Sequence, residues 1–167
     1  MEDVKSILRK AIRIEEEGYK FFEETAKKIR HSLGRRMLEN LAKDELLHIE
    51  RIKEIYADIV EEKAPANLEK VGDTSHFFER LKDSIDGSIS DLGPLNVDDR
   101  EIIDAAINLE SKTMFFYDEI AKSTNNPKLK EFCKRLSKEE HMHFEVLQKI
   151  PDYAQDPSLL FTAGNRV

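Results

Sequence analysis

The chain has 167 residues, a length typical of one domain. Its 34 acidic and 27 basic residues give a formal charge of −7, which argues against nucleic-acid binding because that function normally requires a basic surface. The single cysteine, Cys133, excludes a disulfide framework, a cysteine-based zinc site and a CxxC redox motif in this sequence, and it fits a reducing compartment.

A first helix hairpin is predicted over about residues 3–62. Apolar residues recur in steps of three and four over residues 3–30, which is typical of an amphipathic helix. The segment His31-Ser32-Leu33-Gly34 interrupts this stripe. A second stripe follows from Leu38 to Ile59 and fades at residues 61–65. Two helices joined by a short turn are expected to lie antiparallel.

A long crossover is predicted over about residues 63–96. Residues 64–75 contain Pro65 and Gly72 and are expected to form a loop. A short helix is expected from about Ser75 to Ile89, although Gly87 weakens it, and Gly93-Pro94 ends the segment. We expect one apolar side of this helix to cover the bundle or a subunit interface: Phe77, Phe78, Leu81 and Ile85.

A second hairpin is predicted over about residues 97–150. Asn96 is a favourable N-cap, and the following stripe extends to the break at residues 123–127. Asn126-Pro127 then combines an N-cap with proline at the first helical position, which marks the start of a fourth helix. Pro151 and Pro157 indicate an irregular tail over residues 151–167.

Four long helices with two short turns and one long connection predict an all-α protein. The crossover can return along the length of the bundle, so that the second and third long helices run parallel. This is the ferritin-like four-helix bundle, here over residues 1–150.

The two hairpins are also related in sequence. Residues 8–55 and 103–150 align without a gap at an offset of 95 and share 13 identities in 48 positions. The repeat retains a Glu followed, 30 residues later, by a Glu-x-x-His motif. We therefore expect two hairpins related by approximate two-fold symmetry.

Six polar residues interrupt the apolar stripes and are expected to face the core. Within each hairpin, the two glutamates are equidistant from the turn, about 15 residues or ~22 Å along the bundle at 1.5 Å per residue. All six side chains should converge on one layer: Glu15, Glu45, His48, Glu110, Glu140 and His143.

Four buried and unpaired carboxylates would cost several kcal/mol each or be forced to bind protons. Two divalent cations would balance their four charges. A donor set of carboxylates and imidazoles suits Fe, Mn or Zn better than Ca or Mg. The sequence therefore predicts a metal centre, which accounts for more than half of the acidic excess.

At these positions the chain resembles the rubrerythrin-like branch of the ferritin-like di-iron family, over roughly residues 3–60 and 97–150. The resemblance implies two Fe ions per chain, with Mn or Zn as alternatives. It implies bridging roles for Glu45 and Glu140, terminal roles for Glu15 and Glu110, and one metal for each histidine. It is carried by Glu15-x5-Phe21-Phe22, Asp44-Glu45-x-x-His48, Glu110-x5-Phe116-Tyr117 and Glu139-Glu140-x-x-His143.

Two features depart from rubrerythrins proper. A rubredoxin domain requires two cysteine pairs, whereas this sequence has one cysteine. Rubrerythrins also carry an extra Glu three residues after the third-helix ligand, where this chain has Thr113. The extra Glu is linked to movement of one iron during peroxide reduction, so its loss weighs against a rubrerythrin-style peroxidase without excluding redox chemistry.

Several residues near the motifs have two interpretations. A register shift would make Glu16 or Glu17 a ligand in place of Glu15. Asp44 and Glu139 either orient a ligand imidazole or are solvated surface acids. Tyr117 either packs in the core or also hydrogen-bonds to the site. The remaining candidates are expected to be exposed or structural: His31, His76, Glu50, His141, Glu145 and, as a small core residue, Cys133.

The leading functional hypothesis is a non-haem di-iron oxidoreductase that acts on O2 or hydrogen peroxide, with electrons from an external donor such as a rubredoxin-type protein. The alternatives are iron handling, meaning ferroxidation, storage or sequestration, and a structural or sensory di-metal bundle without turnover. We expect a homodimer or higher homo-oligomer. The N-terminus lacks a signal-type apolar core and no apolar run spans a membrane, so a cytoplasmic protein is expected.

Overall fold

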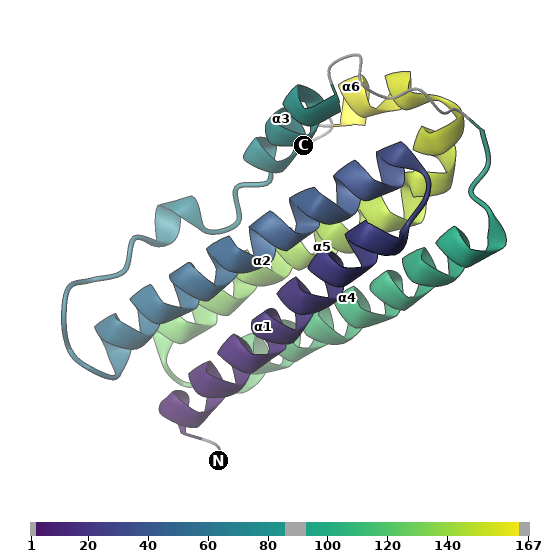
Figure 1. Ribbon diagram of the computed structural model, residues 1–167. Coiled ribbons are helices and arrows are strands. Elements are labelled where there is room, and N and C mark those ends of the chain that lie inside the picture. The colour runs from purple at the N-terminus through teal and green to yellow at the C-terminus, as the bar shows by residue number, and fades with distance from the viewer. Residues whose placement is uncertain (1–2, 86–92, 164–167) are drawn as a thin grey trace.

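The computed structural model describes residues 3–85 and 93–163, and within these ranges it contains helices and no strand (Figure 1). It confirms the all-α ferritin-like bundle. The elements in chain order are α1 (Val4–Lys28), α2 (Ser32–Ile59), the 3-10 turn η1 (Leu68–Lys70), α3 (Ser75–Ile85), α4 (Val97–Ser123), α5 (Pro127–Gln155), η2 (Pro157–Leu159) and α6 (Leu160–Ala163).

The four long helices form two antiparallel hairpins, α1 with α2 and α4 with α5. Helix α2 also packs against α5, and α1 against α4. The crossover returns the chain to the end where α2 began, so α2 and α4 run in the same direction (Figure 1). This is the topology expected from one long and two short connections.

Each long helix begins at a side-chain cap. Asp3, Asn96 and Asn126 accept hydrogen bonds from backbone N–H groups three residues further on, as good N-caps do. His31 caps α2, because its Nδ1 accepts from the N–H of Leu33 at 3.2 Å. His31 is buried and structural, one of the two roles expected for it.

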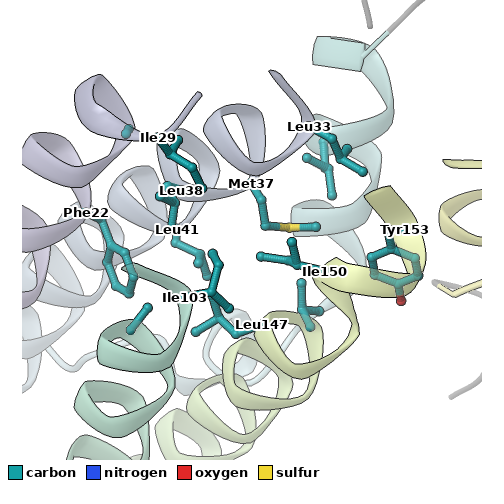
Figure 2. Close-up of a cluster of buried hydrophobic side chains, with 14 of the residues drawn as sticks. Phe22, Ile29, Leu33, Met37, Leu38, Leu41, Ile103, Leu147, Ile150 and Tyr153 are labelled. Carbon is teal, nitrogen blue, oxygen red and sulfur yellow. The ribbon is translucent and has the colours of Figure 1, made fainter. Parts of the chain in front are cut away.

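The bundle interior contains two apolar clusters at different heights. One lies near the α1–α2 turn and includes Phe22, Leu41 and Leu147 (Figure 2). The other lies toward the opposite end and includes Leu8, Ile52 and other buried residues. The layer between them contains the six polar residues predicted to face the core.

The expectation of an irregular tail from residue 151 was wrong. Helix α5 continues through Pro151 to Gln155, and two short helical segments follow. Proline inside a helix costs about 3 kcal/mol because it removes a hydrogen bond and crowds the preceding turn. Burial of Tyr153, Ala154 and Leu160 in the apolar cluster offsets this cost. Residues 164–167 lie outside the described part.

The crossover packs on the bundle along α2 and α5. The predicted short helix is confirmed over Ser75–Ile85, while residues 86–89 of that prediction, including Gly87, lie outside the described residues. Phe77, Leu81 and Ile85 are buried in the apolar cluster near the α1–α2 turn, so this side of α3 covers the bundle.

None of the helices described here combines the length and the apolar character needed to cross a membrane.

Candidate metal centre

The six polar core residues come together in one layer in two overlapping groups. Each group offers one ligand atom per residue, and these atoms lie within 4.8 Å of one another. Glu45 and Glu140 belong to both groups, and all six residues are at most 2 % exposed. The first group is Glu15, Glu45, His48 and Glu140; the second is Glu45, Glu110, Glu140 and His143.

The helical register on α1 selects Glu15. Glu16 and Glu17 are exposed, whereas Glu15 is fully buried. Gly18, one turn further on, leaves room for a neighbouring carboxylate, because a Cβ there would lie 3.1 Å from Glu45 Oε2. In the repeat, Thr113 takes the place of Gly18, and its hydroxyl donates to the carbonyl of Leu109 on the same helix at 3.1 Å.

Both imidazoles direct Nδ1 into the cluster. His48 Nδ1 lies 3.3 Å from Glu15 Oε2 and 3.0 Å from Glu140 Oε1. His143 Nδ1 lies 3.4 Å from both Glu110 Oε1 and Glu140 Oε2. The two rings stack with centroids 5.5 Å apart and an interplanar angle of 20°. The cluster thus has an approximate two-fold arrangement about Glu45 and Glu140.

The outer nitrogen of each histidine is held by a carboxylate from the other hairpin. His143 Nε2–H donates to Asp44 Oδ2 at 2.8 Å, and His48 Nε2–H donates to Glu139 Oε2 at 2.6 Å. Both carboxylates are buried, so they orient the imidazoles and are not solvated surface acids. Such hydrogen bonds fix the tautomer and leave Nδ1 available to a metal.

Tyr117 breaks the two-fold pattern on the Glu15 side. Its ring is buried in the core, and its hydroxyl donates to Glu15 Oε1. Tyr117 therefore fulfils both roles considered for it. Its counterpart in the repeat is Phe22, which has no hydroxyl to offer Glu110.

The crossover contributes three contacts that the sequence did not reveal. Arg80 Nη2 donates to Asp44 Oδ1 at 2.6 Å, and the backbone N–H of Gly72 donates to Glu139 Oε1 at 2.7 Å. His76 Nε2 lies 3.6 Å from Asp44 Oδ1. The crossover has no counterpart in the repeat, and these contacts join positions far apart in the chain. No motif or periodicity marked them.

A pocket of about 210 Å³ opens beside these contacts. It reaches the outer edge of His48 and Glu139, while the Nδ1 side of His48 faces the buried cluster. Its lining is Leu47, His48, Arg51, Lys70, Asp73, His76 and Glu139.

The electrostatics distinguish Glu140 from Glu45 and Glu110. Burial, reinforced by repulsion from neighbouring carboxylates, raises the pKa of Glu45 and Glu110 well above the ordinary value. Burial also opposes ionisation of Glu140, but His48 and His143 hold its pKa well below that value. The two imidazoles therefore favour the ionised form of Glu140.

The imidazoles respond to the same charges. Burial alone would lower the pKa of His48 and His143, but the carboxylates around them raise both well above the ordinary value. Burial likewise opposes ionisation of Asp44, yet its hydrogen bond with His143 and the nearby imidazole of His76 hold its pKa well below normal. Without a metal, the raised pKa values favour protons on both imidazoles and on Glu45 and Glu110, which reduces the negative charge of the buried cluster.

Several buried oxygen and nitrogen atoms that could bind a metal lack a hydrogen-bond partner among the described residues: Glu45 Oε1, Glu110 Oε1, Glu140 Oε1 and Oε2, and His143 Nδ1. Unsatisfied polar atoms in a core are costly and uncommon. Carboxylate oxygens and imidazole nitrogens are the donors that Fe, Mn and Zn prefer. The residues present fit a pair of divalent cations.

The other polar candidates lie away from the cluster. Glu50 and Glu145 are exposed, and the exposed His141 lies 3.5 Å from Asp118. Cys133 is a buried core residue, and burial raises the pKa of its thiol to about 12.

A four-helix bundle with one crossover, a Glu on each of two helices and a Glu-x-x-His on each of the others defines the class of di-metal carboxylate proteins. Comparison with protein families places the chain more narrowly. It belongs to the rubrerythrin family, whose sequence profile matches residues 6–88 and 101–158 and so spans all six cluster residues. No curated protein and no solved structure matches the chain.

Proposed function

We propose that this protein is a non-haem di-iron oxidoreductase that reduces hydrogen peroxide or O2. The observation that supports this most directly is the pair of overlapping donor groups that share Glu45 and Glu140, with unsatisfied buried atoms facing one another. A bound iron pair would supply two-electron redox chemistry toward a small oxygen species.

The residues of the cluster would have different roles at the metal centre. Glu45 and Glu140 would be available to both ions, Glu15 and His48 would complete one position, and Glu110 and His143 would complete the other. Asp44 and Glu139 hold the imidazoles from outside. The apolar clusters on either side of the layer exclude bulk water, which strengthens every charge interaction in it.

The electrons would come from a separate carrier, for example a rubredoxin-type protein, because the sequence has one cysteine and a rubredoxin site requires four. We further propose a cytoplasmic location and a homodimer or higher homo-oligomer.

Metal analysis tests the site itself. Protein purified without added metal should contain about two Fe per chain, and the pair Glu45→Gln with Glu140→Gln should lose them while remaining helical by circular dichroism. The matched control is Glu50→Gln with Glu145→Gln, which alters the exposed repeat-related pair two residues after the histidines. Wild-type protein without metal, or equal loss in the control, would contradict the assignment.

Stopped-flow mixing of the di-ferrous protein with peroxide and with O2 tests the reaction. Oxidation should be faster than that of free ferrous iron, and faster with one oxidant than with the other. Light scattering tests the iron-handling alternative. A closed multi-subunit shell would favour iron storage, since a dimer has no room for a mineral core.

A further inference from the structure

The crossover treats the two outer carboxylates differently. Asp44 and Glu139 are repeat-related, and each supports the histidine of the opposite hairpin. Asp44 receives the guanidinium of Arg80 from α3, whereas Glu139 receives the neutral backbone N–H of Gly72. The hydrogen-bond chain through Asp44 thus ends at a positively charged guanidinium, whereas the chain through Glu139 ends at a neutral backbone amide.

Arg80 is held firmly in this position. Its Nε donates to Asn40 Oδ1 at 2.7 Å, and its Nη2 donates to the Asn40 carbonyl at 2.9 Å and to Asp44 Oδ1 at 2.6 Å. These acceptors lie one turn apart on α2. The guanidinium also lies over the ring of Phe77, with 5.8 Å between its central carbon and the ring centroid. The side chain is 25 % exposed, so solvent only partly screens its charge.

Asp44 transmits this contact to the cluster. Its Oδ1 accepts from Arg80 while its Oδ2 accepts from His143 Nε2, so the carboxylate plane is fixed at both oxygens. His143 Nδ1 in turn faces Glu110 and Glu140. His76 Nε2, at 3.6 Å from Asp44 Oδ1, is too distant to replace the arginine hydrogen bond.

We infer that Arg80 is a positioning residue that makes the two metal positions unequal, by fixing Asp44 and through it the imidazole of His143. The inference rests on the proposed di-metal function and deepens it. In the described part of the chain, the carboxylate behind His143 accepts a hydrogen bond from a crossover side chain, whereas the carboxylate behind His48 accepts one from a crossover backbone N–H. Loss of such an outer hydrogen bond typically weakens metal binding about 10–100-fold.

The test is a titration of metal-free protein with Co²⁺, followed by its visible absorption, in wild type, Arg80→Leu and Arg80→Lys. Wild type should bind two ions. Arg80→Leu should bind one ion as wild type does and the other about 10–100-fold more weakly, with an altered spectrum for that ion. Arg80→Lys should recover part of the affinity, because it restores the charge but not the forked geometry.

Lys128→Leu is the matched control. Lys128 Nζ donates to Asp58 Oδ1 at 2.6 Å, and Asp58 Oδ2 accepts from the backbone N–H of Ala66 at 2.9 Å, so this contact ties the same crossover to α2 and α5 without involving either outer carboxylate. This variant should lower thermal stability and leave both Co²⁺ affinities unchanged. Equal weakening of one ion in both variants would reduce Arg80 to a general crossover contact and overturn the inference.

A double-mutant comparison identifies the position affected. In a His143→Ala background, Arg80→Leu should not change the affinity of the remaining ion; in a His48→Ala background it should still weaken it. The opposite pattern, or equal weakening of both ions, overturns the inference while the proposed function stands. Absence of Co²⁺ binding by wild type would remove the proposed function, and this inference with it.

Discussion

At the scale of single residues, the site depends on where side chains are absent as well as where they are present. Gly18 lies in the middle of α1, where glycine is unfavourable, yet a Cβ there would crowd Glu45 Oε2. The sequence therefore has a residue of low helix propensity at the position where the carboxylate of Glu45 requires space.

Gly18→Ala should separate stability from metal binding. The metal-free protein should be stabilised by up to about 1 kcal/mol, because alanine favours the helix. Metal affinity should fall about tenfold, because Glu45 must shift. Denaturant unfolding and competition with a chelator measure the two effects. Lys20→Ala, an exposed change on the same helix, should leave metal affinity unaltered, and unchanged affinity in Gly18→Ala would show that Glu45 tolerates the crowding.

Tyr117 is the second residue whose role can be isolated. Burial and the charge of Glu15 raise the pKa of its hydroxyl well above the ordinary value, so it remains a donor to Glu15 at physiological pH. Tyr117→Phe leaves a buried carboxylate oxygen without this donor and should destabilise the metal-free protein by about 1–3 kcal/mol. Denaturant unfolding provides the measurement, and unchanged stability would mean that Glu15 finds another donor.

At the scale of elements, the sequence was sufficient wherever local pattern decides structure. Hydrophobic spacing placed Glu45 and His48 on the buried face of α2, and Asn126-Pro127 marked the start of α5. It failed at Pro151, where local propensity opposes a helix that burial sustains. It was also silent on Arg80, since a contact between α3 and α2 has no local signature.

The α1–α2 turn is held by an element remote in sequence. Asp99, in the first turn of α4, is 2 % exposed and accepts hydrogen bonds from the backbone N–H groups of Arg30 and His31, both at 3.0 Å. This contact joins the two hairpins at one end of the bundle.

Loss of these two hydrogen bonds, here called the Asp99 clamp, should destabilise the contact between the two hairpins. Asp99→Ala leaves two backbone donors of the turn without their partner and should lower the free energy of unfolding by about 1–3 kcal/mol. Chemical denaturation measures the loss. Asp98→Ala, an exposed acidic neighbour in the same helical turn, should have a clearly smaller effect. Similar losses in the two variants would show that the helix terminus, rather than the clamp, is responsible.

At the scale of the whole molecule, the layer of ionisable residues lies between two apolar clusters. Metal and protons compete for the same buried atoms, so protonation of the layer is coupled to metal binding. The raised pKa values of His48, His143, Glu45 and Glu110 mean that the metal-free fold retains protons that the unfolded chain would release. Their contribution to stability is present at low pH and is lost as pH rises through the raised values. Asp44 and Glu140 act oppositely, because their lowered pKa values favour the fold above the ordinary carboxyl range.

Metal binding should consequently strengthen with pH. Ions must displace protons from the imidazoles and glutamates, so the stabilisation conferred by metal should be larger at about pH 8 than at about pH 6. At a free metal concentration near 100 times the dissociation constant, each bound ion should contribute about 2.7 kcal/mol. Thermal unfolding with and without metal at both pH values gives the difference. A metal-induced shift independent of pH would contradict the proton balance described for the cluster.

The hydrogen bonds between each outer carboxylate and the histidine of the other hairpin bear on how the repeat could arise in evolution. Because each hairpin supports the histidine of the other, one hairpin pairing with a copy of itself would already assemble four glutamates, two histidines and both outer carboxylates. A gene duplication that fused two such copies would preserve the site and add a linker. Fused copies would be free to diverge. Tyr117 opposite Phe22, and Arg80 in the linker, are differences that a symmetric dimer of identical chains cannot have.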